Sequence, residues 1–228
     1  FTVVCNAVSL WKQEARVRGV VEYTKDEVRP RFRDAWRTFA GGGQAVRLLV
    51  ASGIGFFAFN LQDVLLEPYG GEILHLTVSQ TTMLTGIMAA GAVAAFALSA
   101  SMLRRHHDPI RLAALGALVG IMGFAMIVFA SPLGSPMLFR AGVALIGFGE
   151  GLFGVGTLSF AMQLKDASQH GIALGAWGAV FATAEGLSFA LSGLLKDWLS
   201  HLVERGALGP GLSIASVPYS VVYHLEIF

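Results

Sequence analysis

The sequence has little charge and almost no cysteine. Only 14% of its 228 residues are Asp, Glu, Lys or Arg, whereas a soluble domain carries about 25%. Its one cysteine, Cys5, excludes an intrachain disulfide and forms no cysteine-based metal pattern. No Ser/His/Asp or Cys/His arrangement has a supporting sequence context. We therefore see no catalytic site and no metal site in the sequence, and we expect a protein that is not an enzyme.

Long uncharged stretches account for the low charge. No Lys, Arg, Asp or Glu lies between Glu72 and Arg104, or between Arg111 and Arg140. The only such residue in 141–164 is Glu150, and the only one in 167–195 is Glu185. Each stretch is longer than the roughly 20 residues that cross a bilayer as a helix. The pattern predicts an all-α membrane protein with several spans.

The order of polar and apolar segments predicts five complete spans within residues 44–200. Residues 1–11 have the character of the end of a preceding helix, and 218–228 that of the start of a following one. The connector 12–43 is polar, and its RPRFRDAWRTF stretch fits an interfacial helix or a solvated loop equally well. Residues 201–217 are expected to form an external loop. The five predicted spans are approximately Ala45–Leu66, Val78–Leu103, Ile110–Ala130, Met137–Leu164 and Gly171–Trp198.

The distribution of basic residues predicts the orientation in the membrane. Nine of the 16 Lys and Arg residues lie between Lys12 and Arg47, three more lie in the turn RRHHDPIR, and Lys165 follows two spans later. If the segment 12–47 is cytoplasmic, alternation of the spans puts all 13 of these residues inside, as the positive-inside rule requires. Because acids interrupt the basic run, a loop facing the lipid bilayer explains it better than a nucleic-acid site.

The stretch GFGEGLFGVG, residues 147–156, contains a formal GxGxxG. A dinucleotide-binding loop needs a strand before the motif and an acid about 20 residues after it, and both are missing here. Glycines four residues apart instead let membrane helices approach closely. We therefore predict helix packing at three glycine pairs, which are Gly116 with Gly120, Gly147 with Gly151, and Gly171 with Gly175.

Glu150 and Glu185 each lie near the middle of a predicted span. A charge at that depth costs several kcal/mol, so such residues usually face the bundle interior. Helical spacing puts Gly147 and Gly154 on the face of Glu150, and Ser188 and Ser192 on the face of Glu185. Both acids are expected to face a neighbouring helix or a cavity. A ligand contact or proton site, and a structural hydrogen bond between helices, both remain open as their role.

Further polar residues lie in FNLQDVLLEPYGG and at the end of the sequence. Asn60, Asp63 and Glu67 share one helical face and predict a polar inward stripe, although Glu67 alone also fits an interfacial carboxylate. A histidine near the end could ligate a metallated pigment, but a plain polar contact fits it better. The complete set of candidate cofactor contacts is Asn60, Gln62, Asp63, Glu150, Glu185 and His224.

Four strings resemble the PucC family of the major facilitator superfamily, which occurs in photosynthetic organisms. They are LQDVLLEPYGG (61–71), RLAALGALVGIMGF (111–124), LFRAGVALIGFGEGLFGVGTL (138–158) and GIALGAWGAVFATAEGLSFALSG (171–193). The resemblance implies the carboxy-terminal six-helix half of a twelve-helix fold, truncated at both ends. Residues 1–11 would then end helix six, 12–43 would form the cytoplasmic loop between the halves, and 44–200 would hold helices seven to eleven. A periplasmic loop at 201–217 and the start of helix twelve at 218–228 would complete it.

The resemblance also implies a function in a bacterial inner or intracytoplasmic photosynthetic membrane. It implies an assembly factor that holds or delivers bacteriochlorophyll to single-span antenna polypeptides of light-harvesting complexes. Expected partners are antenna α/β polypeptides and also reaction-centre or pigment-synthesis proteins. Two alternatives stay open, namely a small-molecule transporter coupled to protons through Glu150, Glu185 or Asp63, and a stable structural subunit of a photosynthetic supercomplex.

Overall fold

The computed structural model describes residues 32–41, 43–163, 170–205, 219 and 221–224. All the regular secondary structure in this described part is helical. The predictions for 1–11, for most of 12–43, for 206–217 and for 225–228 concern residues outside it. The expected all-α membrane protein is confirmed. Its assignment to one half of a major facilitator fold remains a prediction.

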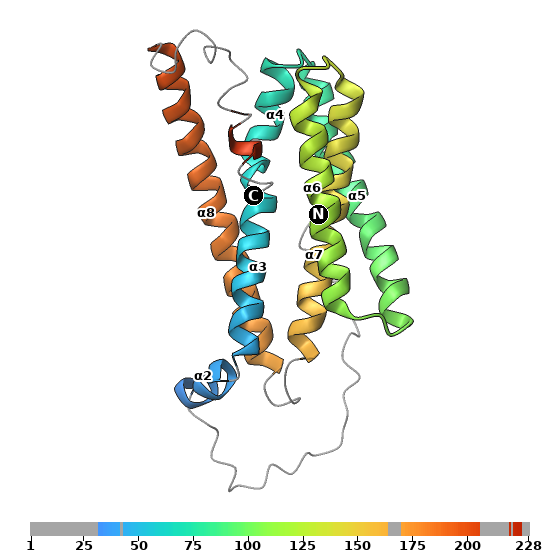
Figure 1. The fold of residues 1–228 in the computed structure, drawn as a ribbon, viewed down its shortest axis with the longest axis vertical. Coiled ribbons are helices and arrows are strands. Elements are labelled where there is room, and N and C mark those ends of the chain that lie inside the picture. Colours follow the sequence, from blue (N-terminus) through green and yellow to red (C-terminus); the bar gives the residue numbers. More distant parts are fainter. Residues whose placement is uncertain (1–31, 42, 164–169, 206–218, 220, 225–228) are drawn as a thin grey trace, which may run out of the picture.

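Among the described residues, five helical segments are long and apolar enough to cross a membrane, and they run alongside one another (Figure 1). The first is interrupted at Gln62 and so counts as two elements. The elements are α3 (Gln44–Leu61), α4 (Asp63–Glu72), α5 (Val78–Arg104), α6 (Pro109–Ala130), α7 (Pro136–Gln163) and α8 (His170–Glu204). The last of these continues to Glu204, past the predicted end of the spans at residue 200.

Capping side chains mark the starts of α5 and α6. Thr77 and Gln80 form a capping box at the start of α5, in which each side chain bonds the other residue's backbone amide. Asp108 caps α6 by accepting a hydrogen bond from the Ile110 amide at 2.9 Å, and Pro109 occupies the first helical position. The uncharged stretches therefore begin with side chains that satisfy the otherwise free amides of a helix start.

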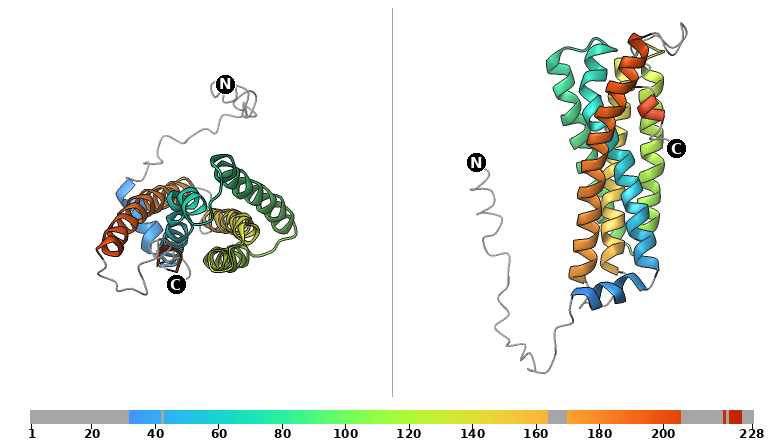
Figure 2. Two further views of the ribbon diagram at one scale, coloured as in Figure 1. Left: turned by 90° about the horizontal axis from the view of Figure 1, so that it is seen from above. Right: turned by 90° about the vertical axis from the view of Figure 1, so that its left-hand side faces the viewer.

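The helices form two groups. Helices α5 and α6 each pack closely on α7, while α8 packs on α3, and α7 joins the two groups (Figures 1 and 2). Half of the membrane-spanning part of α7 is buried inside the protein, against 17% for α5 and for α8. Helix α7 is therefore the core helix, and α5 and α8 leave large apolar faces uncovered.

Glycines make the contacts of α7 with α5 and α6 close. A Cβ added at Gly116 would lie 2.5 Å from the carbonyl oxygen of Gly149, and one at Gly151 would lie 2.8 Å from the Cβ of Ala95. A Cβ at Gly147 would collide with the backbone of Met88. Gly120 faces a neighbouring ring, since a Cβ there would lie 2.5 Å from Phe59. The structure thus places four of the six predicted packing glycines at close helix approaches.

The third predicted pair, Gly171 and Gly175, differs from the other two. A Cβ added at either position meets no atom within 4 Å, and both residues are exposed. Within the described part of the chain, no other helix packs against them. The GxxxG spacing marks a face that can accept a helix, but it does not show that the same chain supplies that helix.

A short helix, α2 (Phe32–Gly41), lies at one end of the bundle beside α3 and α8 (Figures 1 and 2). Its Phe39 is 1% exposed and packs in a cluster with Leu49 and Ala173. Arg33 and Arg37 are exposed on the same helix. For the described part of RPRFRDAWRTF, which begins at Phe32, the structure thus favours the interfacial amphipathic helix over the solvated loop.

At the other end of the bundle, a polar clamp joins α4 and α8 to the helical residues 219 and 221–224. The Tyr219 hydroxyl donates to Glu72 Oε2 at 2.6 Å, and Lys196 Nζ lies 3.8 Å from Glu72 Oε1. The same Lys196 nitrogen lies 5.1 Å from the centre of the Tyr219 ring. The rings of Tyr69 and Tyr219 contact edge to face at 5.5 Å. The last described segment is thus attached to the main bundle.

Candidate functional site

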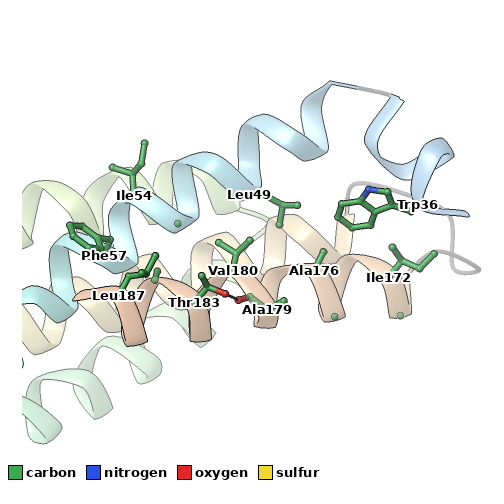
Figure 3. Close-up of a pocket in the computed structure, with 14 residues that line it drawn as sticks. Trp36, Leu49, Ile54, Phe57, Ile172, Ala176, Ala179, Val180, Thr183 and Leu187 are labelled. Carbon is green, nitrogen blue, oxygen red and sulfur yellow. Dashed lines mark hydrogen bonds between the residues drawn. The ribbon is translucent and has the colours of Figure 1, made fainter. Parts of the chain in front are cut away.

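A long apolar groove of about 880 Å³ lies between α2, α3 and α8. Figure 3 shows Leu49 and Phe57 of α3 on one side, Ile172 and Leu187 of α8 on the other, and Trp36 of α2 at one end. Gly171 and Gly175 also line this groove, so part of its wall is bare helix backbone. An occupant has to be largely apolar, because apolar side chains and glycines make up almost all of the lining.

Thr183 is the one hydroxyl residue in the lining of this groove. Its hydroxyl donates to the carbonyl oxygen of Ala179 at 2.7 Å, as the dashed line in Figure 3 shows. Because that donor is satisfied within α8, the groove can accept apolar surface without leaving this hydroxyl unpaired.

A second, smaller pocket of about 410 Å³ contains the acid in the middle of α7. Helices α3, α5, α7 and α8 all contribute to it, and Glu150 is its one charged lining residue. Its lining consists of Phe56, Ala92, Phe96, Glu150, Gly151, Gly154, Val155, Leu158, Trp177 and Phe181. The prediction that Glu150 faces a cavity agrees with this placement.

Aromatic rings form one wall of the Glu150 pocket. The rings of Trp177 and Phe181 are nearly parallel, with centres 5.8 Å apart, and Phe56 meets both edge to face. The Trp177 indole nitrogen donates to Thr157 Oγ1 at 3.1 Å, and that hydroxyl donates to the Phe153 carbonyl at 2.9 Å. These bonds fix the plane of the indole in the wall.

Sequence reasoning did not select the aromatic residues of this wall. The signal was nevertheless present, because Trp177, Phe181 and Glu185 follow one another at intervals of four residues along α8. That spacing puts them on one helical face. An acid one turn from one aromatic ring and two turns from another is a stronger indication of a site than the acid alone.

Three acids from three helices converge beside the pocket. Asp63 of α4 and Glu185 of α8 interact electrostatically, and Glu150 of α7 interacts with both. All three side chains are partly buried. In the described part of the chain, the one recorded ion pair is that of Lys196 with Glu72, so none of the three is paired with a base. No group of His, Cys, Asp and Glu among the described residues is arranged to hold a metal ion.

Gln62 extends this acidic cluster at the break between α3 and α4. The residue is 0% exposed, and its Nε2 donates to Asp63 Oδ1 at 2.7 Å. Its Oε1 is buried and has no hydrogen-bond partner. We define Gln62, Asp63, Glu150 and Glu185 as the acidic cluster.

The other candidate residues have different surroundings. Asn60 is buried, and its amide donates to the Phe56 carbonyl of its own helix at 2.7 Å. Glu67 is exposed and accepts from the Thr85 hydroxyl at 3.3 Å, so the predicted inward stripe does not extend to it. His224 is exposed and does not line the Glu150 pocket. Along the predicted stripe, Asn60 is buried, Asp63 is partly buried and Glu67 is exposed.

Comparison with known proteins gives a consistent set of relatives. The model of the PUCC protein family matches residues 1–228. Protein PucC of Cereibacter sphaeroides is 42% identical over 221 residues, which are 97% of this chain and 47% of the relative. A protein of Rhodobacter capsulatus described as uncharacterized, in the puhA-bchM intergenic region, is 44% identical over 226 residues, or 99% of this chain and 47% of its own length.

A more distant relative is the Bacteriochlorophyll synthase 44.5 kDa chain of Rhodobacter capsulatus. It is 28% identical over 192 residues, which cover 81% of this chain and 43% of the relative. The chain spans about half the length of the curated relatives that it matches. No solved structure matches it with significance. On the family match over residues 1–228 and the identity above 40%, the chain belongs to the PUCC protein family.

Proposed function

We propose that this chain forms part of a membrane assembly factor for bacterial light-harvesting complexes. It would hold single-span antenna α/β polypeptides and bacteriochlorophyll in the photosynthetic membrane, with residues 12–43 on the cytoplasmic side. The names of the relatives support a role near bacteriochlorophyll synthesis, since one is a bacteriochlorophyll synthase chain and another is encoded between puhA and bchM. Reaction-centre and pigment-synthesis proteins are further expected partners.

The observation that carries this proposal is the apolar groove between α2, α3 and α8. Between lipid-exposed helices there is little hydrophobic driving force, so association depends on close packing against small residues. Gly171 and Gly175 provide such a surface, and no described helix of this chain occupies it. A transmembrane helix of a client polypeptide would therefore gain close backbone contact along α8.

The Glu150 pocket supports the pigment part of the proposal. A bacteriochlorophyll is flat and apolar, and a carboxylate could bind its magnesium. The pocket offers a carboxylate at Glu150 and a stacked wall of Trp177 and Phe181. A pocket of about 410 Å³ is at the smaller end of the usual range of 300–1,000 Å³ for small-molecule sites, so part of the macrocycle and its tail would lie outside it. In this position the chain would orient the pigment for a client polypeptide.

A matched pair of glycine variants tests the client site. Gly175→Leu places a side chain in the groove, whereas Gly86→Leu places one on α5, and a Cβ at either position meets no atom within 4 Å. Both variants should fold. After purification from pigmented membranes, we expect Gly175→Leu to lose co-purifying antenna polypeptides and Gly86→Leu to retain them. Equal retention by both variants would refute the groove as the client site.

A proton-coupled transporter is the second candidate, and the convergence of Asp63, Glu150 and Glu185 favours it. Inward-facing acids in a membrane bundle are common in proton relays. Uptake of a substrate into proteoliposomes, driven by a pH gradient and abolished by Glu150→Gln, would support this function. Retention of co-purifying antenna polypeptides by Glu150→Gln, together with loss of uptake, would separate transport from client binding, because the client groove does not contain that acid.

A further inference from the structure

The acidic cluster carries three carboxyl groups, and among the described residues no basic side chain forms an ion pair with them. Its three carboxyl groups lie within the segments that cross the membrane. A charge at that depth is costly unless it is paired, and like charges close together raise the cost. Within the described residues no Lys or Arg forms an ion pair with the cluster. The three acids therefore need protons or a positively charged ligand.

The hydrogen-bonding groups of the cluster are almost all acceptors. Gln62 Nε2 is the one side-chain donor, and it is already bonded to Asp63. The Gln62 carbonyl oxygen is buried without a donor. Among the described residues no hydrogen bond is recorded for the side chains of Glu150 and Glu185. A complementary ligand would donate hydrogen bonds and carry positive charge, because charge-assisted hydrogen bonds are the strongest available here.

An aromatic pocket lies directly beside the cluster. Glu150 belongs to both, and Phe181 and Trp177 lie one and two turns from Glu185 along α8. The electron-rich faces of aromatic rings attract cations within about 6 Å. The pocket is otherwise apolar, so it suits the hydrocarbon or aryl body of a ligand whose charged end points toward the acids.

From this geometry we propose that the acidic cluster and the Glu150 pocket bind an amphipathic ammonium cation. Its apolar body would lie against Phe56, Trp177 and Phe181, and its N–H groups would donate to Glu150 and to Gln62 Oε1. Charged groups face this site from α4 (Asp63), α7 (Glu150) and α8 (Glu185). Helix α5 contributes none, because it has no Lys, Arg, Asp or Glu between Val78 and Leu103. The inference does not rest on the proposed assembly function.

Three small probes test the chemistry of the ligand. Dansylcadaverine is a fluorescent primary ammonium, dansylamide is its neutral counterpart, and tetraphenylphosphonium is a cation without an N–H donor. The purified protein, free of pigment and in nanodiscs of zwitterionic lipid, is titrated with each probe. Fluorescence energy transfer from tryptophan to the dansyl group measures binding of the two dansyl probes. Displacement of bound dansylcadaverine measures binding of tetraphenylphosphonium. We expect the ammonium to bind at least about tenfold more tightly than either of the others. Equal affinity for the ammonium and the neutral probe would overturn the proposal.

Two carboxylate variants test the location. Glu150→Gln should weaken dansylcadaverine binding at least about tenfold, whereas Glu67→Gln should leave it unchanged, because Glu67 is exposed and outside the cluster. Size-exclusion profiles and melting temperatures establish that each variant folds. If Glu150→Gln does not fold, Glu185→Gln takes its place with the same expectation. A loss of binding in Glu67→Gln equal to that in the cluster variant would refute the assignment.

The pH dependence gives an independent readout. Protons and the ammonium compete for the same carboxylates, so affinity should fall as the pH is lowered from 8 toward the acid range. The probe itself stays charged over this range, because an alkylamine such as that of Lys has a pKa of about 10.4. In Glu150→Gln the slope should be smaller. Binding that does not change with pH in the wild-type protein would contradict an ammonium held by these acids, and it would leave the groove-based assembly function untouched.

Discussion

Replacing glycines in α6 and α8 with alanine should change stability in opposite directions. A Cβ at Gly116 would lie 2.5 Å from both the carbonyl oxygen of Gly149 and the backbone nitrogen of Phe153. Both atoms belong to the backbone of α7, so no side chain can rotate away. Helices α6 and α7 would have to separate by several tenths of an ångström or more along their contact. Overpacking of this kind costs about 1–3 kcal/mol.

Gly175→Ala is the matched control, because it makes the same chemical change where a Cβ meets no atom within 4 Å. In a helix interior, alanine is favoured over glycine by about 0.5–1 kcal/mol. Reversible unfolding in mixed micelles with a denaturing detergent measures both changes. We expect Gly116→Ala to unfold at lower denaturant and Gly175→Ala at equal or higher denaturant than the wild type.

The partner glycine sharpens the test. A Cβ at Gly149 would lie 2.7 Å from the carbonyl oxygen of Gly116, so both substitutions strain one contact. Once the first alanine has moved the helices apart, the second should cost less than it does alone, since mutations at one contact are not additive. Equal destabilisation by Gly116→Ala and Gly175→Ala would show that backbone contact between α6 and α7 does not determine stability here.

Two further substitutions test polar contacts between helices. Tyr219→Phe removes the 2.6 Å hydrogen bond to Glu72 and should lower the free energy of unfolding by about 1 kcal/mol, because Glu72 is exposed to solvent. A double-mutant cycle with Glu72→Gln measures the coupling between the two residues. Additive losses would count against the clamp. Trp177→Phe removes the 3.1 Å bond to Thr157 and should likewise cost about 1 kcal/mol. Because that bond orients the indole, Trp177→Phe should also weaken dansylcadaverine binding, whereas Thr157→Ser, which keeps the acceptor, should not.

The spans could be predicted well from sequence, since their signal is the lack of charge. The predicted Val78–Leu103 and Ile110–Ala130 correspond to α5 and α6 within one residue at each end. The interruption at Gln62 was not anticipated, because FNLQDVLLEP has no glycine near that point. Pro68 lies inside α4 and cannot donate a backbone hydrogen bond, which weakens the helix after the break.

The candidate site could be predicted only in part. Depth in the bilayer identified Glu150 and Glu185 separately, because depth depends on position along one span. Their approach to Asp63 depends on how α4, α7 and α8 are rotated against one another, and a single sequence does not report rotation. The same limit applies to the glycines. Gly147 and Gly171 have equivalent GxxxG spacing, yet the first packs against Met88 and the second faces an open groove.

The two ways in which these helices touch explain why both candidate sites involve α3 and α8. Helix α7 meets α5 and α6 through backbone atoms at glycines, and such contacts cannot yield without moving a whole helix. Helix α8 instead meets its neighbours through the side chains of Trp177 and Phe181, which contact Phe56 of α3. Side chains can change rotamer at a cost of order 1 kcal/mol. A ligand or client helix can therefore be accommodated at α3 and α8 while the glycine-packed helices keep their positions, so α5, α6 and α7 provide the rigid support on which binding takes place.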